Sequence, residues 1–138
     1  MQPVVLDTNI LVAALRSKTG ASHCLLLQLA SVRQWQPCVS TALTLEYESV
    51  LRRHALALGL ALNDADVLVN FVSGAARECQ IRFRWRPLSA DAGDDLVLEV
   101  AIAAGARYII TFNKRDFVEA AKFGIEVVTP REFLNTLN

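Results

Sequence analysis

The 138-residue sequence has no net charge, because 14 basic residues balance 14 acidic ones. A balanced chain carries no overall field that would draw it onto nucleic acid or an anionic membrane. Any such binding must therefore come from local patches of charge. Cysteine is scarce as well, with only Cys24, Cys38 and Cys79 and no Cys-x-x-Cys pair. This odd, scattered set fits buried thiols in a reducing compartment better than a disulfide framework.

No apolar run approaches the roughly 20 residues that cross a bilayer. No basic stretch precedes the first apolar run either, and a secretory signal would require one. We therefore expect a cytoplasmic protein without membrane association. Only two histidines are present, His23 and His54. Together with the dispersed cysteines, this argues against a zinc site.

No repeat, linker or low-complexity segment interrupts the chain, and its length suits a single domain over residues 1–138. Short β-rich runs alternate with longer helical patterns. The expected strands are 3–6, 36–39, 108–111 and 125–128. The expected helices are 10–15, 21–33, a segment from 41 to 51, one starting at 63 or 64, 91–104, 114–122 and 130–137. The alternation predicts an α/β fold, an α/β/α sandwich around a central parallel sheet.

The expected ends of these helices follow from local chemistry. Ser22 is a candidate cap for the second helix, and Ser40 or Thr41 for the third. Gly105 and Gly124 are expected to stop the helices that precede them, because glycine readily adopts the left-handed conformation found there.

Carboxylates follow two of the predicted strands. Asp7 ends the run of residues 3–6, and Asp116 lies just beyond residues 108–111. In a parallel sheet ligands bind outside the carboxyl ends of the strands, so the two acids are expected to share one site. Two carboxylates about 4 Å apart repel by roughly 4 kcal/mol at an effective dielectric near 20. Such a cluster therefore needs a proton or a metal ion.

Asp7 has a simpler interpretation, because Asp is a favoured helix N-cap. Two features favour a ligand role instead. Asp7 stands at the end of the first strand, and Thr8 and Asn9 add two oxygen-bearing side chains at the same turn. Mg²⁺ is held by one or two carboxylates and by water that neutral groups orient.

Glu46 and Glu48 share the helix that begins near residue 41, about 200° apart around its axis. Only one of them can face the site. Glu46 lies at the edge of the apolar face and is our candidate, whereas Glu48 points toward Arg52. The alternative for either acid is a surface ion pair with Arg52 or Arg53.

Asp91, Asp94 and Asp95 open an apolar helix. Acids in a first helical turn interact favourably with the helix dipole, by about 0.3–1 kcal/mol each, which is reason enough for one or two of them. Asp94 shares a face with the buried stripe of that helix and is our third candidate ligand. Asp95 is expected to face Glu99 and solvent.

Asp116 is the fourth candidate, although a cap or a surface acid would have the same sequence. It follows two polar residues, Thr111 and Asn113, directly behind a buried strand. Thr8, Asn9, Thr111 and Asn113 are our candidates for orienting water or phosphate.

Residues 82–86 alternate arginine with aromatic side chains. Arg82, Arg84 and Arg86 would lie on one side of an extended segment and could contact phosphates, with Trp85 stacking on a base. An edge strand whose charges block unwanted pairing explains the same pattern equally well.

Two further basic residues, Lys114 and Arg115, have a better case for contacting phosphate because they adjoin the proposed site.

The leucine-rich stripes at 25–29 and 56–62 are expected to be core or a dimer face.

Together, these motifs resemble a PIN domain, in order and over essentially the whole chain. The motifs are Asp7-Thr8-Asn9, Glu46 in its helix, Asp94-Asp95, and Thr111-x-Asn113-x-x-Asp116-Phe117. The resemblance is greatest to the bacterial VapC-like toxins of toxin–antitoxin pairs. It implies a Mg²⁺- or Mn²⁺-dependent ribonuclease with Asp7, Glu46, Asp94 and Asp116 as its acidic quartet, an antitoxin partner, and possible dimerisation. Many relatives carry Asp where this chain has Asn113, which would weaken a second metal position.

Oxygen ligands alone favour Mg²⁺ or Mn²⁺ and suit phosphodiester hydrolysis. Two alternatives stay open. One is another phosphate-processing hydrolase, although an aspartyl-phosphate phosphatase would require a second aspartate at the position of Asn9. The other is a non-catalytic module that binds RNA or protein, although such a module has no use for a self-repelling acid cluster.

Overall fold

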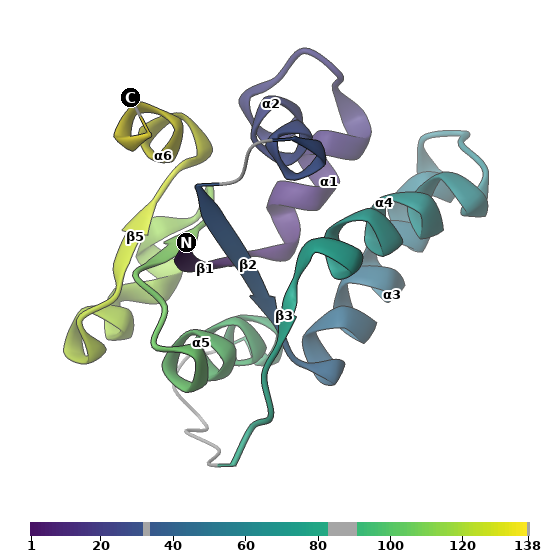
Figure 1. Ribbon diagram of the computed structural model, residues 1–138. Helices are drawn as coiled ribbons and strands as arrows, with labels where there is room; N and C mark the ends of the chain where they lie inside the picture. Colours follow the sequence, from purple (N-terminus) through teal and green to yellow (C-terminus); the bar gives the residue numbers. More distant parts are fainter. Residues whose placement is uncertain (32–33, 83–90, 138) are drawn as a thin grey trace.

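The computed structural model describes residues 1–31, 34–82 and 91–137. Strands and helices alternate along the chain (Figure 1). In chain order the elements are β1 (Gln2–Leu6), α1 (Thr8–Arg16), α2 (Ala21–Leu27), the 3₁₀ helix η1 (Gln28–Ala30), β2 (Trp35–Val39), α3 (Thr41–Ala57), α4 (Leu62–Ala75), β3 (Arg77–Glu78), α5 (Ala92–Ala104), β4 (Tyr108–Ile110), the 3₁₀ helix η2 (Lys114–Phe123), β5 (Glu126–Val128) and α6 (Pro130–Thr136).

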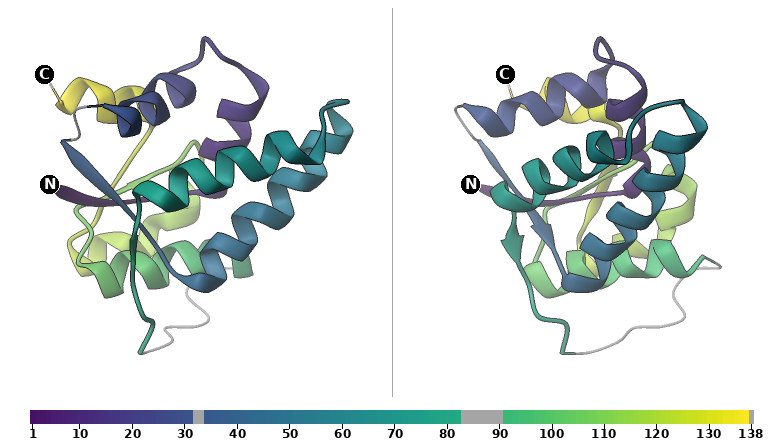
Figure 2. Two further views of the ribbon diagram at one scale, coloured as in Figure 1. Left: turned by 45° about the vertical axis from the view of Figure 1, so that its right-hand side comes forward. Right: turned by 90° about the vertical axis from the view of Figure 1, so that its right-hand side faces the viewer.

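The strands form one parallel sheet in the order β3-β2-β1-β4-β5. Helix α5 packs against β1, β2 and β4, whereas α4 packs against β2 from the opposite side of the sheet (Figure 2). The predicted α/β/α sandwich with a central parallel sheet is therefore confirmed. Because all strands run in the same direction, the loops that follow β1, β2 and β4 lie along one edge of the sheet.

Strand β1 occupies the middle of the sheet, and its last three residues, Val4, Val5 and Leu6, are at most 1% exposed. A strand covered by helices on both faces needs such a continuous apolar run. At the other end of the sheet, Phe133 of α6 meets Trp35 and Tyr108 edge to face, with ring centroids 5.7 and 5.3 Å apart. These ring contacts fix the terminal helix against the core.

Several predicted helix ends are confirmed. Ser40 caps α3 by accepting a hydrogen bond from the backbone N–H of Leu43 at 3.0 Å. Gly105 and Gly124 end α5 and η2 with φ angles of 62° and 72°. The prediction for Ser22 was wrong, because Gly20 is the N-cap of α2 and Ser22 lies buried inside that helix.

Two other features of the fold were not predicted. The second helix ends at Leu27 and continues only as the short η1. The two-residue edge strand β3 pairs with β2 at Cys38 and Val39, and a strand that short has no sequence periodicity. Within the described ranges, no helix is both long and apolar enough to cross a membrane.

Candidate functional site

Asp7 and Thr111 meet where β1 and β4 end. These strands are neighbours, and the backbone N–H of Asp7 continues their pairing by donating to the carbonyl of Ile110 at 3.0 Å. The Thr111 hydroxyl donates to Asp7 Oδ2 at 2.7 Å. Both side chains are buried, Asp7 at 7% exposure and Thr111 at 0%. The carboxylate of Asp7 is thus held in one orientation at the carboxyl edge of the sheet.

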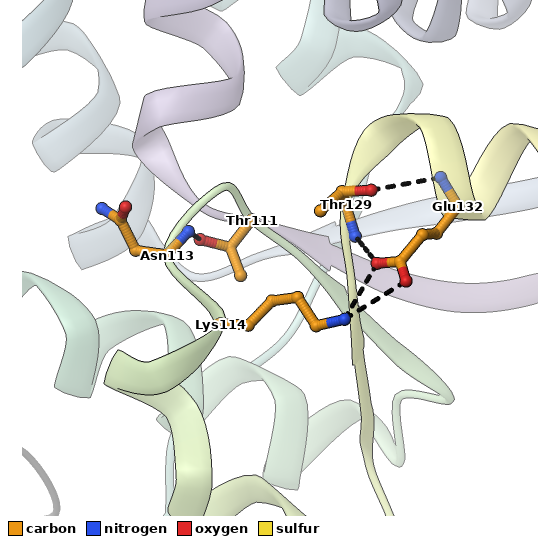
Figure 3. Close-up of polar contacts among 5 residues, drawn as sticks. All are labelled: Thr111, Asn113, Lys114, Thr129 and Glu132. Atoms are coloured by element: carbon orange, nitrogen blue, oxygen red, sulfur yellow. Dashed lines mark hydrogen bonds and ion pairs between the residues drawn. The ribbon is translucent and has the colours of Figure 1, made fainter.

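The oxygen of Thr111 also organises two asparagines. It accepts a hydrogen bond from the backbone N–H of Asn113 at 3.0 Å (Figure 3). It also accepts one from Asn9 Nδ2 at 3.5 Å. The amide oxygen of Asn9 is buried and has no hydrogen-bond partner among the described residues. A buried acceptor of this kind is normally satisfied by water or a ligand, so Asn9 Oδ1 is a candidate to contact one near Asp7.

Asp94 and Asp116 complete a group of carboxylates with Asp7. Partial burial raises the pKa of Asp94 to about 7, and the negative charges of Asp7, Asp91 and Asp116 add to the shift. Burial also raises the pKa of Asp7, with smaller contributions from Asp116 and Asp91, while the hydrogen bond from Thr111 opposes the shift. Asp7 and Asp116 therefore lie near enough to Asp94 to disfavour its ionisation, and Asp116 lies near enough to Asp7 to act on it in the same direction.

Glu46 approaches the start of α5, at Gly93. A methyl group placed on Gly93 would lie 3.2 Å from Glu46 Oε1 and 3.1 Å from Asp91 Oδ1. The bare face of the glycine therefore makes space for two carboxylates next to Asp94. Asp91 also caps α5 by accepting a hydrogen bond from Gly93 N–H at 2.7 Å. Asp91 was not among the predicted site residues, although it opens the same acidic run as Asp94.

Tyr47 follows Glu46 in α3 and joins that helix to the sheet. Its hydroxyl donates to the carbonyl of Leu6 at 2.6 Å, which ties α3 to the end of β1. The side chain is fully buried, and burial raises the pKa of Tyr47 well above its ordinary value, with the nearby charge of Asp7 adding to the effect. Tyr47 was not predicted as a residue of this site, and its position next to Glu46 is the one signal in the sequence that could have indicated it.

The expected orientation of Asp95 was wrong. Asp95 and Glu99 are each 3% exposed, because the middle of α5 is covered on all sides, with every residue from 97 to 101 buried. The prediction for Glu48 is confirmed, since its carboxylate lies 3.9 Å from Arg52 Nη1.

The basic residues near the site differ in what they contact. Lys114 Nζ donates to both carboxylate oxygens of Glu132, at 3.0 and 3.2 Å. Glu132 also accepts a hydrogen bond from the backbone N–H of Thr129, the N-cap residue of α6, whose hydroxyl accepts one from the N–H of Glu132. Figure 3 shows Lys114 extending away from the Asn113 side chain toward α6. Arg115 and Arg82 are exposed. Arg84 and Arg86 lie outside the described residues.

The donor set fits a hard divalent cation. Within residues 1–31, 34–82 and 91–137, no three His, Cys, Asp or Glu side chains are close enough to hold a metal ion as they are placed. Mg²⁺ needs only one or two carboxylates, however, and fills its remaining positions with water. The buried Asn9 oxygen and the two carboxylates over Gly93 supply the oxygen atoms that would orient such water.

These features define a parallel α/β protein with an acidic cluster at the carboxyl edge of its sheet, where such folds bind ligands. Residues 3–115 match the family described as PIN domain, and the chain therefore belongs to the PIN domain family. The family resemblance inferred from the motifs is thus confirmed.

Two solved structures have a similar fold. VapBC-1 from nontypeable Haemophilus influenzae has a TM-score of 0.59 at 12% sequence identity, covering 94% of this chain and 99% of that one. VapBC2 from Rickettsia felis, bound to a DNA fragment from its promoter, has a TM-score of 0.55 at 14% identity, covering 91% and 97%. No curated protein gives a significant match.

Proposed function

We propose that the protein is a metal-dependent endoribonuclease that hydrolyses phosphodiester bonds in single-stranded RNA. The observation that carries the proposal is the gathering of Asp7, Asp94 and Asp116 at the carboxyl edge of the sheet, where the charges of Asp7 and Asp116 add to the burial that raises the pKa of Asp94. None of the three forms an ion pair with another described residue. Such a cluster is costly to fold unless a cation neutralises it, and membership in the PIN domain family supports a nuclease.

In this proposal Asp7, Glu46, Asp94 and Asp116 hold Mg²⁺ or Mn²⁺. A bound ion would lower the pKa of a coordinated water and stabilise charge on the phosphoryl oxygens. Thr111 fixes the Asp7 carboxylate. Thr8, the buried oxygen of Asn9, and Asn113 would orient water or phosphate nearby.

Asn113 stands where many PIN-domain relatives carry aspartate, and this difference affects how many metal ions the site would hold. Asn113 brings no negative charge, so a second metal ion would be held more weakly than the first. Its backbone N–H is already used by Thr111, which leaves only its side chain for a ligand.

The direct test is cleavage of single-stranded RNA by the purified chain with Mg²⁺ or Mn²⁺, stopped by EDTA. Asp7→Asn keeps the shape of the side chain but removes a charge, so cleavage should fall by at least about 100-fold, the usual scale for a lost catalytic group, while the fold persists. Asp66→Asn is the matched control, because Asp66 of α4 forms a surface ion pair with Arg52 of α3. An Asp7→Asn protein that cleaves at the wild-type rate would overturn the proposal.

We also propose that the protein is the toxin of a toxin–antitoxin pair and binds a cognate antitoxin. Support comes from an apolar hollow of about 460 Å³ between α1, α2 and α4. It is partly lined by exposed side chains, including Leu27 at 55%, Val67 at 58% and Phe71 at 36% exposure. Of the two leucine-rich stripes, Leu25, Leu26 and Leu29 are core, whereas Leu56, Leu58, Leu60 and Leu62 are 37–63% exposed. Contiguous apolar surface of this kind marks a protein interface.

The partner proposal is tested by co-expressing the chain with the product of a neighbouring small reading frame. A stable complex that Val67→Glu disrupts would support it. If the isolated chain dimerises by light scattering and Val67→Glu makes it a monomer, the same face is instead a dimer interface.

Two other functions remain distinguishable. A non-catalytic RNA- or protein-binding module would bind with the same affinity in EDTA and would be indifferent to Asp7→Asn. A different phosphate-processing hydrolase, such as a phosphatase, would release inorganic phosphate and leave internal phosphodiester bonds intact.

A further inference from the structure

Phe112 is an aromatic side chain that the proposed chemistry does not use. It lies in the loop between β4 and η2, directly after the buried Thr111. At 48% exposure it is the most exposed aromatic residue in the described part of the chain, ahead of Phe123 at 37% and Phe71 at 36%. A single exposed aromatic is common on protein surfaces, so its surroundings decide whether it has a role.

The surroundings of Phe112 are those of a binding site. It lines an open hollow of about 690 Å³ together with Asn113, Lys114, Arg115 and Asp116. This hollow therefore combines an aromatic face, cationic side chains and one carboxylate of the acidic cluster. A nucleotide offers the complementary groups, because its base has a π face and its phosphate is negative.

The loop that carries Phe112 is fixed on both sides. The backbone N–H of Thr111 donates to Val128 of β5 at 2.9 Å, and its hydroxyl accepts from Asn113 N–H at 3.0 Å. Beyond Phe112, Lys114 is held by Glu132 of α6 (Figure 3). A loop tied down in this way presents the ring without a large loss of conformational entropy on binding.

We propose that Phe112 is a stacking platform for an unpaired base of the RNA, next to the phosphodiester bond that the acidic cluster cleaves. The inference rests on the proposed ribonuclease function and specifies its substrate further. A ring beside the acids can stack only on a base that is free of its complementary strand. Phe112 therefore makes the enzyme prefer single-stranded RNA, and Arg115 lies in the same hollow to contact the adjoining phosphate.

The test measures binding separately from cleavage. The probe is a fluorescein-labelled single-stranded RNA of about 12 nucleotides, within the footprint of stacking proteins, and affinity is measured by anisotropy in EDTA. Phe112→Ala should weaken binding by about 5- to 100-fold, the range measured for base–aromatic stacking, whereas Phe112→Trp should restore it. Phe123→Ala is the matched control, because Phe123 is similarly exposed but lines a separate hollow at Gly124 and Ile125. That control should bind as wild type does.

The same RNA annealed to its complement tells stacking from general affinity. Phe112→Ala should leave binding of this duplex unchanged. The stacking role would be overturned if Phe112→Ala lost affinity equally for the single strand and the duplex, or lost affinity for neither. It would also be overturned if the wild-type protein did not bind the single strand. If the Phe112 effect persists but no RNA is cleaved with any metal, the ribonuclease proposal fails and the binding platform stands. If RNA is cleaved and Phe112→Ala has no effect, only the platform fails.

Discussion

The hydroxyl of Thr111 donates a 2.7 Å hydrogen bond to the carboxylate of Asp7, joining residues that are 104 positions apart in the sequence. The bond stabilises the ionised form of a carboxyl group whose burial otherwise raises its pKa. The same oxygen accepts hydrogen bonds from Asn9 and Asn113. One buried threonine thus sets the position of several polar groups at the candidate site.

Thr111→Val should destabilise the protein by about 1–3 kcal/mol, because Asp7 Oδ2 and the Asn113 N–H would lose a buried partner without a change in side-chain shape. It should also raise the pKa of Asp7 further. Urea unfolding at neutral pH measures the first effect. Thr111→Ser is the control, since it keeps the hydroxyl. A Val variant as stable as wild type would show that water replaces the hydroxyl.

The pH dependence of stability follows from Asp94. Its pKa is about 7 in the folded protein, against 3.8 for the ordinary group, so between these values the folded state binds more protons than the unfolded state. Stability of the metal-free protein should therefore fall as pH rises from about 4 to 7 and level off above that range. The raised pKa of Asp7 acts in the same direction. Denaturant unfolding in EDTA measures the curve, and Asp94→Asn should flatten it. A curve that rises with pH, or one that is unchanged in Asp94→Asn, would contradict the expected shift.

Metal binding should raise the melting temperature, because an ion that binds only the folded state stabilises it by about 2.7 kcal/mol at 100 times its dissociation constant. The gain from Mn²⁺ or Mg²⁺ should be larger at pH 8 than at pH 6, since protons compete for Asp94. Thermal scans with metal and with EDTA provide the measurement. Asp7→Asn and Asp94→Asn should reduce the gain. A melting temperature indifferent to both ions at either pH would count against a metal site.

Gly93→Ala tests the space that the glycine leaves for Glu46 and Asp91. The new methyl group would lie 3.2 and 3.1 Å from their oxygens, so both carboxylates must shift. Because these are the ends of flexible side chains, we expect a change in unfolding free energy within about 1 kcal/mol, the glycine-to-alanine scale in helices. Metal affinity by calorimetric titration should nonetheless fall several-fold. Gly74→Ala is the control, since nothing beyond its chain neighbours and the backbone of its own helix lies within 4 Å of the added methyl group, and it should leave metal affinity unchanged. Unaltered metal binding by Gly93→Ala would show that Glu46 takes no part.

The candidate site could be predicted from the sequence only as far as strand ends place its residues. Asp7 and Asp116 each follow a short buried strand, and helix ends at Ser40 and Gly105 have strong local signals. Asp91 was not predicted because an aspartate at the start of a helix has the same local sequence whether it only caps the helix or also takes part in a site. Only the tertiary structure shows that Asp91 and Glu46 lie together beside Gly93.

The orientation of side chains around α5 was not predictable in full. Apolar spacing predicted a buried stripe on this helix, but it also predicted that Asp95 faces Glu99 and solvent, and both acids are buried. Periodicity assumes one exposed face, whereas α5 is covered around most of its circumference. The edge strand β3 was not predicted either, because its two residues have no periodic pattern of their own. They form a strand only because β2 lies beside them.

The sequence by itself determined a parallel α/β sheet with acids at the carboxyl ends of its strands, because buried apolar runs and helical periodicity are local properties of the chain. Only the tertiary structure decided which groups meet there. The contact of Thr111 with Asp7 depends on the pairing of β1 with β4. The direction of Lys114 depends on where α6 places Glu132. Both are set by the packing of segments distant in sequence, and no local pattern encodes that packing.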